Sequence, residues 1–185
     1  MPLFNDNTTS LISSSHPGFV VGRYYASTSF TPSSSLTYFG TGYVFYAYFF
    51  VSFAQSFDAL VFQNSKSLSS AQEVRLAIYT VESGLPSKLV TDLGKIIFTS
   101  VGFKQISCSV YLRPGWYAVA LQTSPNSVVL ASSIINLSNL LGQINPSVYS
   151  FSGFKANLTY GTFPSVASQA NLTEADAPTI WLKAS

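Results

Sequence analysis

Residues Gln105–Gln122 read QISCSVYL-RPG-WYAVALQ and decide the fold class of this chain. In the first half, apolar or small side chains alternate with polar or aromatic ones, which is typical of a strand with one buried face. Arg113-Pro114-Gly115 then has the composition of a turn, with Gly115 expected at positive φ, and WYAVALQ is typical of a second strand. The stretch therefore predicts an antiparallel β-hairpin. The side chains expected on its core face are Ile106, Cys108, Val110 and Leu112.

The apolar run Tyr43–Ala54 (YVFYAYFFVSFA) predicts a central strand, because it is apolar on both faces and needs cover on both. In Glu73–Val81 (EVRLAIYTV), apolar residues alternate with Glu73, Arg75 and Ala77, so we expect one core face and one solvent-facing side. A turn is expected at residues 83–88, where Gly and Pro occur. Further strands are expected at Phe19–Ser27, Phe57–Phe62, a short stretch ending at Val90, Lys95–Phe98, Val128–Ala131, Val148–Phe154 and Thr179–Lys183.

Many short strands bounded by turns, with no long amphipathic helix, predict an all-β domain. We expect an antiparallel β-sandwich of jelly-roll type over residues 18–185. The one helical pattern is weak, with apolar residues spaced for one or two turns between Ile134 and Gly142.

Residues 1–17 form a polar segment of low complexity ahead of the sandwich. Two interpretations are open: a disordered leader, or a flexible N-terminal arm that becomes ordered when it docks on a neighbouring subunit. Isolated apolar residues favour the arm, because a purely solubilising tail does not need them. The side chains expected to fill pockets on the partner are Phe4 and either Leu11 or Ile12.

Charge and aromatic content set this chain apart from an ordinary globular domain. Charged residues make up 9% of the sequence, against about a quarter in a typical domain, while aromatic residues make up 15%. Such a surface suits a protein that packs against copies of itself, and we expect a homotrimer. The net charge of +2 comes without any basic cluster, so no nucleic acid partner is expected. The run Tyr43–Ala54 is shorter than the roughly 20 residues of a spanning helix, so no membrane insertion is expected.

Side chains suited to catalysis are scarce, and we expect no enzymatic activity and no cofactor. His16, the only histidine, lies in the polar leader, and Cys108, the only cysteine, falls in register with apolar neighbours as a core residue would. Asp58 lies within an apolar run, where a strand-end turn or edge charge is favoured over an inward, hydrogen-bonded carboxylate. Glu174 and Asp176 are closely spaced, but a solvated loop is favoured over a calcium site, and no metal is expected.

Two further sets of residues are candidates for interaction with carbohydrate, one as glycosylation sites and one as a binding surface. Four N-x-S/T sequons begin at Asn7, Asn136, Asn157 and Asn171. We expect them to be unglycosylated, because residues 1–15 carry no secretory signal and the chain is expected to fold in a reducing cytoplasm. For most tyrosines, packing in the core or an interface is favoured, with stacking on sugar rings as the alternative. The stacking candidates are Tyr24, Tyr25, Tyr38, Tyr43, Tyr46 and Tyr48.

Three short motifs carry a family resemblance. They are Arg75-Leu76-Ala77-Ile78-Tyr79, Gly84-Leu85-Pro86 and Pro114-Gly115-Trp116-Tyr117. In this order they resemble a β-sandwich module of tail-fibre, baseplate and other virion proteins of tailed bacteriophages. The match departs at Ala77 and Ser87, where that module usually has glycine. The resemblance covers a little over half of the chain, residues 22–122, and it implies a particle protein that is often a homotrimer.

The position on the particle stays open between two alternatives. A free-standing domain with a polar arm is similar to a capsid decoration (cement) protein, and its short length favours this interpretation. A tail-fibre or baseplate module that binds a host receptor or glycan is the alternative. The expected partners are copies of the chain, the major capsid protein or tail proteins, and a host surface glycan in the second case. The expected location is the virion, after synthesis in the host cytoplasm.

Overall fold

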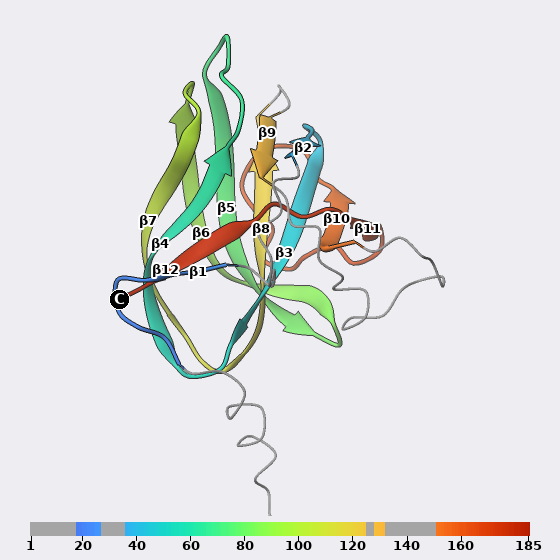
Figure 1. The fold of residues 1–185 in the computed structure, drawn as a ribbon. Helices are drawn as coiled ribbons and strands as arrows, with labels where there is room; N and C mark the ends of the chain where they lie inside the picture. The colour runs from blue at the N-terminus through green and yellow to red at the C-terminus, as the bar shows by residue number, and fades with distance from the viewer. Residues whose placement is uncertain (1–17, 27–35, 125–127, 132–150) are drawn as a thin grey trace, which may run out of the picture.

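The computed structural model describes residues 18–26, 36–124, 128–131 and 151–185 of this chain. Every regular element in these ranges is a β-strand (Figure 1). The strands are β1 (Tyr24–Ala26), β2 (Leu36–Phe39), β3 (Tyr43–Val51), β4 (Gln55–Asn64), β5 (Gln72–Glu82), β6 (Leu85–Phe98), β7 (Gly102–Leu112), β8 (Gly115–Thr123), β9 (Val128–Ala131), β10 (Gly153–Asn157), β11 (Thr173–Ala175) and β12 (Ile180–Ala184). Within these ranges, no helix is long and apolar enough to cross a membrane.

The strands form two antiparallel sheets that pack against each other, which confirms the predicted β-sandwich. Sheet A has the order β1-β12-β4-β9-β2, and β7 is also paired with β4. Sheet B has the order β11-β10-β3-β8-β5-β6. In Figure 1, β1, β4, β7 and β12 lie on one side of the molecule, and β10 and β11 lie on the other.

The space between the sheets is filled by an aromatic and aliphatic core. Phe49 of β3 meets Phe57 of β4 edge to face, with ring centroids 5.7 Å apart. Phe62 of β4 meets Phe98 of β6 in the same way at 5.6 Å. Such pairs add about 0.5–1.5 kcal/mol to the free energy of burial. Other fully buried members of this core are Phe39, Leu60, Val74, Leu76, Ile78, Val119, Leu121, Leu130, Ile180 and Leu182.

The outer face of sheet B is buried as well. The prediction that β3 is covered on both sides is confirmed, whereas the solvent-facing side predicted for β5 is wrong, since Ala77 and Tyr79 have no exposed surface. The cover is provided by residues 158–172, which we call the cover segment. Its Phe163 packs edge to face on Tyr79, with centroids 6.3 Å apart, and belongs to a second apolar cluster on this face. Sheet B therefore lies between two apolar layers.

The predicted hairpin at Gln105–Gln122 is wrong in its pairing. β7 pairs with β4 in sheet A, whereas β8 lies between β3 and β5 in sheet B. Arg113-Pro114-Gly115 thus carries the chain from one sheet to the other, as the descent from β7 and the return into β8 show in Figure 1. The predicted faces are correct, because Ile106, Val110 and Leu112 point into the core. Gly115 has the expected positive φ, at 151°.

Other strands differ from the prediction mainly in their ends. β6 is one strand rather than two short ones, and it follows a tight turn at Ser83 and Gly84, both of which have positive φ. Among the described residues of the first predicted strand, 19–26, only Tyr24–Ala26 form a paired strand. The strand predicted at Thr179–Lys183 is confirmed as β12, and Val128–Ala131 is confirmed as β9. The strand predicted at Val148–Phe154 overlaps β10 only at Gly153 and Phe154, because β10 continues to Asn157; residues 148–150 lie outside the described residues. The weak helical pattern at 134–142 lies outside the described residues, and so does the arm at 1–17.

Candidate functional site

The six tyrosines considered for sugar stacking separate into buried and exposed residues. Tyr46 and Tyr48 are buried under the cover of sheet B, so stacking on a ligand is wrong for both. Burial raises the pKa of the Tyr46 hydroxyl to about 12, and the Tyr48 hydroxyl donates to the carbonyl of Gly84 at 2.8 Å. Tyr25 packs edge to face on Phe19. Tyr38 lies in β2, in a part of the chain where no side chain is described. Tyr24 and Tyr43 remain at the surface, and each lines a hollow.

The first hollow lies on the outer face of sheet A, and we call its lining the aromatic patch. Its residues come from four strands that lie side by side: Tyr24 of β1, Trp181 of β12, Val61 of β4, and Phe103 and Gln105 of β7. Trp181, Val61 and Gln105 are direct cross-strand neighbours, so they form one row across the sheet. Phe103 meets Trp181 edge to face at 5.6 Å. The hollow measures about 430 Å³.

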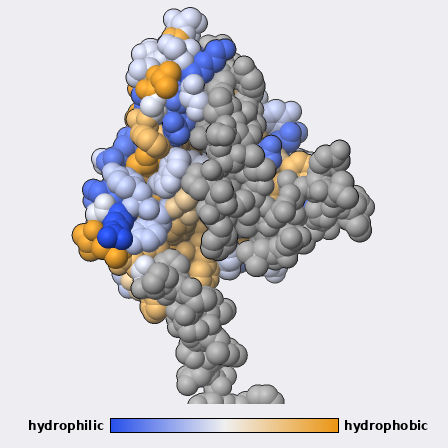
Figure 2. Space-filling view, in the orientation of Figure 1, coloured by the Kyte–Doolittle hydropathy of each residue, from blue (hydrophilic) through white to orange (hydrophobic). Residues whose placement is uncertain are grey.

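The aromatic patch is open to solvent. Tyr24 is 50% exposed and Phe103 64% exposed, whereas Val61 forms a buried floor between them. Further exposed apolar residues, Val20 and Val21, precede β1. Figure 2 shows hydrophobic residues at the surface at its lower left, in the region of β1 and the C-terminus. Three aromatic rings, those of Tyr24, Phe103 and Trp181, therefore gather on the outer face of sheet A, whereas other exposed apolar residues, such as Ile97 of β6, lie elsewhere.

Asp58 lies at the border of this face. The interpretation as a strand-end or edge charge is wrong, because Asp58 lies inside β4, a strand with neighbours on both sides. Its carboxylate accepts a hydrogen bond from Lys183 Nζ at 3.0 Å, and this bond raises the pKa of the Lys183 ammonium. The strand is bulged at this point, between Phe57 and Ala59. The Asp58–Lys183 ion pair therefore lies beside the aromatic patch, and its two opposite charges neutralise each other.

Cys108 lies at the margin of the core, half-buried and in contact with the interior cluster. Its thiol lies 3.5 Å from the carbonyl oxygen of Phe57. Burial raises the pKa of this thiol to about 11, so the neutral thiol predominates at neutral pH. The chemistry of this position is that of a small packing residue.

The acidic pair near the C-terminus is placed differently from the prediction. Glu174 lies in β11, so the solvated loop predicted there is wrong for this residue. Asp176 follows the strand and is exposed, as the prediction has it, and partial burial raises the pKa of its carboxyl. Among the residues that the structure describes, no three His, Cys, Asp or Glu side chains gather as metal ligands would.

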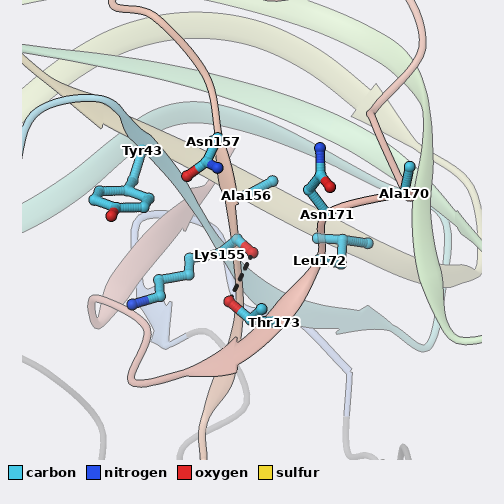
Figure 3. A pocket seen from close by; sticks show the side chains of 8 residues that line it. All are labelled: Tyr43, Lys155, Ala156, Asn157, Ala170, Asn171, Leu172 and Thr173. Atoms are coloured by element: carbon cyan, nitrogen blue, oxygen red, sulfur yellow. Dashed lines mark hydrogen bonds between the residues drawn. The ribbon is translucent and has the colours of Figure 1, made fainter.

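The second hollow, the Tyr43 pocket, lies at the β11 edge of sheet B and measures about 460 Å³ (Figure 3). Tyr43 is paired with Asn157 across β3 and β10, and Lys155 is paired with Thr173 across β10 and β11. Because paired residues share a face, these four side chains converge on one side of the sheet. Asn171, just before β11, lines the opposite wall. Neither the sequence of β10 (GFKAN, residues 153–157) nor the sequons at Asn157 and Asn171 predicted that these side chains would lie close together.

The arm residues predicted to bind a partner, Phe4, Leu11 and Ile12, lie outside the described residues, as does His16. The chain matches no protein-family model, and no curated protein matches it. The two hollows are therefore the features on which an assignment of function depends.

Proposed function

We propose that this chain is a non-enzymatic structural protein on the exterior of a bacteriophage particle, where it acts as a homotrimeric capsid decoration protein. The observation that carries the proposal is the aromatic patch on the outer face of sheet A. Protein interfaces are enriched in Tyr, Trp and Phe and depleted in charge, and the patch has both properties. The low charge content of the whole chain, 9%, agrees with a protein that is soluble chiefly as part of an assembly.

The resemblance to virion modules gives a second line of support. Its three motifs fall in β5, in the turn that leads into β6, and in the turn that leads into β8. These strands are direct neighbours in sheet B, in the order β8-β5-β6. The motif residues thus form one contiguous structural unit. A shared scaffold explains such motifs better than a shared active site, because the unit is covered by the chain itself.

The oligomer is tested by light scattering coupled to gel filtration. We expect a species of three times the chain mass of 20.0 kDa. Replacing Phe103 by Ser removes an exposed ring from the aromatic patch and is expected to release monomers. The matched control is Ile97→Ser, because Ile97 is similarly exposed, at 56%, but lies on β6 of the other sheet. A monomeric wild-type protein at micromolar concentration, or a Phe103→Ser variant that stays trimeric, contradicts this assignment.

Immunogold labelling of phage particles that encode the chain tests the location. Label distributed over the capsid supports the decoration protein. Label confined to the tail supports the alternative, a tail-fibre or baseplate module that binds a host receptor or glycan. Particles without label contradict both.

The arm is tested by deletion of residues 1–17. We expect the shortened chain to keep the fold of the sandwich and to bind particles stripped of the native protein more weakly than the full chain does. The measurement is co-sedimentation with such particles. Equal binding of the two chains contradicts a docking role for Phe4, Leu11 and Ile12.

A further inference from the structure

The Tyr43 pocket is lined by polar side chains that make few interactions within the fold. Within the described part of the chain, the side-chain amides of Asn157 and Asn171 have no hydrogen-bond partner. The Thr173 hydroxyl donates to the carbonyl of Lys155 at 3.5 Å, a long bond that leaves the oxygen free to accept. In Figure 3, the Asn157 amide and the Lys155 ammonium lie beside the Tyr43 ring, and Asn171 lies across Ala156 from them. Donors and acceptors thus line an open hollow.

Lys155 brings a positive charge that no carboxylate neutralises in the described residues. Lys88, Lys95 and Lys183 each form an ion pair, with Glu82, Glu73 and Asp58. The ammonium of Lys155 instead lies 5.1 Å from the centroid of the Tyr43 ring. A cation on an exposed aromatic ring is held more weakly than a cation in a charge-assisted hydrogen bond. The carboxylate of a ligand is therefore able to form an ion pair with the Lys155 ammonium and draw it away from the Tyr43 ring. One face of the ring then becomes accessible to the ligand.

Sugars suit this combination of groups. An aromatic ring stacks on the apolar face of a pyranose, and amides that both donate and accept match its hydroxyl groups. The volume of about 460 Å³ lies within the range of small-ligand sites and accommodates one or two sugar rings. The unpaired ammonium selects for a sugar that carries a negative charge.

We propose that the Tyr43 pocket binds an acidic saccharide, with the sugar face on Tyr43, its carboxylate on Lys155, and its hydroxyl groups on Asn157 and Asn171. This site is on sheet B and shares no residue with the aromatic patch of sheet A. The inference goes beyond the proposed function, and the two are tested by different residues. Acidic sugars are abundant in bacterial surface polysaccharides, so such a site would give the assembled protein an affinity for cell surfaces.

The test is binding of defined acidic oligosaccharides, measured by saturation-transfer NMR and calorimetry. The probes are disaccharides of galacturonic, glucuronic and mannuronic acid, together with sialyllactose. Galactobiose serves as the neutral counterpart of digalacturonic acid, because it differs only in carrying hydroxymethyl groups in place of carboxylates. We expect at least one acidic probe to bind and its neutral counterpart to bind at least about tenfold more weakly.

Two variants locate the site without disturbing the core. Lys155→Met is expected to lose about tenfold in affinity for the acidic probe, and Asn171→Asp to lose more, because it places a negative charge in the pocket. Lys88→Met is the matched control, since Lys88 lies on β6 and pairs with Glu82. Thermal melting of each variant confirms that the fold is retained. The proposal is overturned if no acidic probe binds, if galactobiose binds equally well, if acetate binds as tightly as the sugar, or if Lys88→Met weakens binding as much as Lys155→Met.

Discussion

The outer faces of the two sheets differ in the burial of their aromatic residues. On sheet B, Tyr46 and Tyr79 are fully buried, because the cover segment 158–172 lies over them. On sheet A, Tyr24, Phe103 and Trp181 line an open hollow, and nothing in the described chain covers them. Sheet B is thus completed within the monomer, whereas sheet A presents a surface suited to a partner. The comparison therefore favours sheet A as the site of the proposed intermolecular contact.

The cover of sheet B is held by polar contacts as well as by packing. Arg75 and Asp92 form an ion pair at 2.9 Å, and Asp92 also accepts a hydrogen bond from the backbone N–H of Phe163 at 3.4 Å. Glu73 accepts from the Tyr160 hydroxyl at 3.0 Å and from Lys95 at 2.8 Å. These side chains on β5 and β6 therefore fasten the cover segment at its start. The charges that predicted a solvent-facing side of β5 serve this attachment instead.

The largest expected effect comes from adding a methyl group to sheet B on the face that it turns toward the core between the sheets. Gly153 of β10 lies between Ala47 of β3 and Ala175 of β11. A Cβ at this position would overlap the backbone carbonyl of Tyr46 and come within 2.8 Å of Ala177 Cβ. Because backbone cannot give way as a flexible side chain does, we expect Gly153→Ala to lower the free energy of unfolding by about 3 kcal/mol or more.

Denaturant titration of wild type and variant at equal protein concentration measures this loss. Gly161→Ala is the matched control, because a Cβ at Gly161 meets no atom within 4 Å and its φ is not positive. Its free energy of unfolding should stay within about 0.5 kcal/mol of wild type. If the two alanine variants are equally stable, β10 does not form part of the sheet as described.

The second prediction tests the attachment of the cover segment itself. The Tyr79 hydroxyl is buried and donates to the carbonyl of Pro164 at 2.7 Å. Tyr79→Phe keeps the ring and leaves that carbonyl without its donor, so we expect a loss of about 1 kcal/mol. Tyr117→Phe removes a similar bond, to the Arg113 carbonyl at 3.0 Å, but at an exposed position, and should cost less than about 0.5 kcal/mol. Equal losses, measured by denaturant titration, would mean that the cover segment is not fastened through Tyr79.

The sequence predicts strand faces well and strand partners poorly. In β7, alternation correctly assigns Ile106, Val110 and Leu112 to the core, because side chains alternate between faces in any strand. Alternation holds equally for a hairpin and for a crossing between sheets, so Arg113-Pro114-Gly115 was predicted as a hairpin turn. The choice between the two depends on which strands flank β8, and both β3 and β5 are distant in sequence.

The covered face of sheet B shows a second limit. The apolar character of Tyr43–Val51 on both faces correctly predicts two-sided burial of β3. The cover segment itself has no periodic pattern, because it is bound through single contacts such as those of Phe163 and Tyr160. The two hollows have the same origin: each is assembled from side chains of three or four strands, and no motif within one strand indicates the site.

The third prediction is a pH dependence of the cover attachment. The hydrogen bond from Lys95, followed by that from Tyr160, lowers the pKa of Glu73 below its usual value of 4.5. Because the pKa of Glu73 is lower in the folded state than in the unfolded state, its carboxylate stabilises the fold at every pH above the unfolded-state pKa. This stabilisation is lost as the pH falls through the folded-state pKa. We expect wild-type stability to decline below about pH 4.5 more steeply than that of Glu73→Gln, which cannot titrate. Parallel pH profiles of the two melting temperatures would show that Glu73 does not contribute.

The smallest expected effect on the fold comes from the bare face of sheet A. Phe103 is exposed and contacts Trp181 only at its edge, so Phe103→Ser should change the stability of the isolated subunit by no more than about 0.5 kcal/mol. Its effect should instead appear in how stability depends on protein concentration.

A trimer is stabilised by mass action, so the melting temperature of the wild-type protein should rise with concentration. The variant, as a monomer, should melt at one temperature at all concentrations. The control Ile97→Ser should keep the concentration dependence of wild type. If the wild-type melting temperature is independent of concentration, or if Phe103→Ser unfolds the subunit as Gly153→Ala is expected to do, then the aromatic patch of sheet A belongs to the fold and not to an interface.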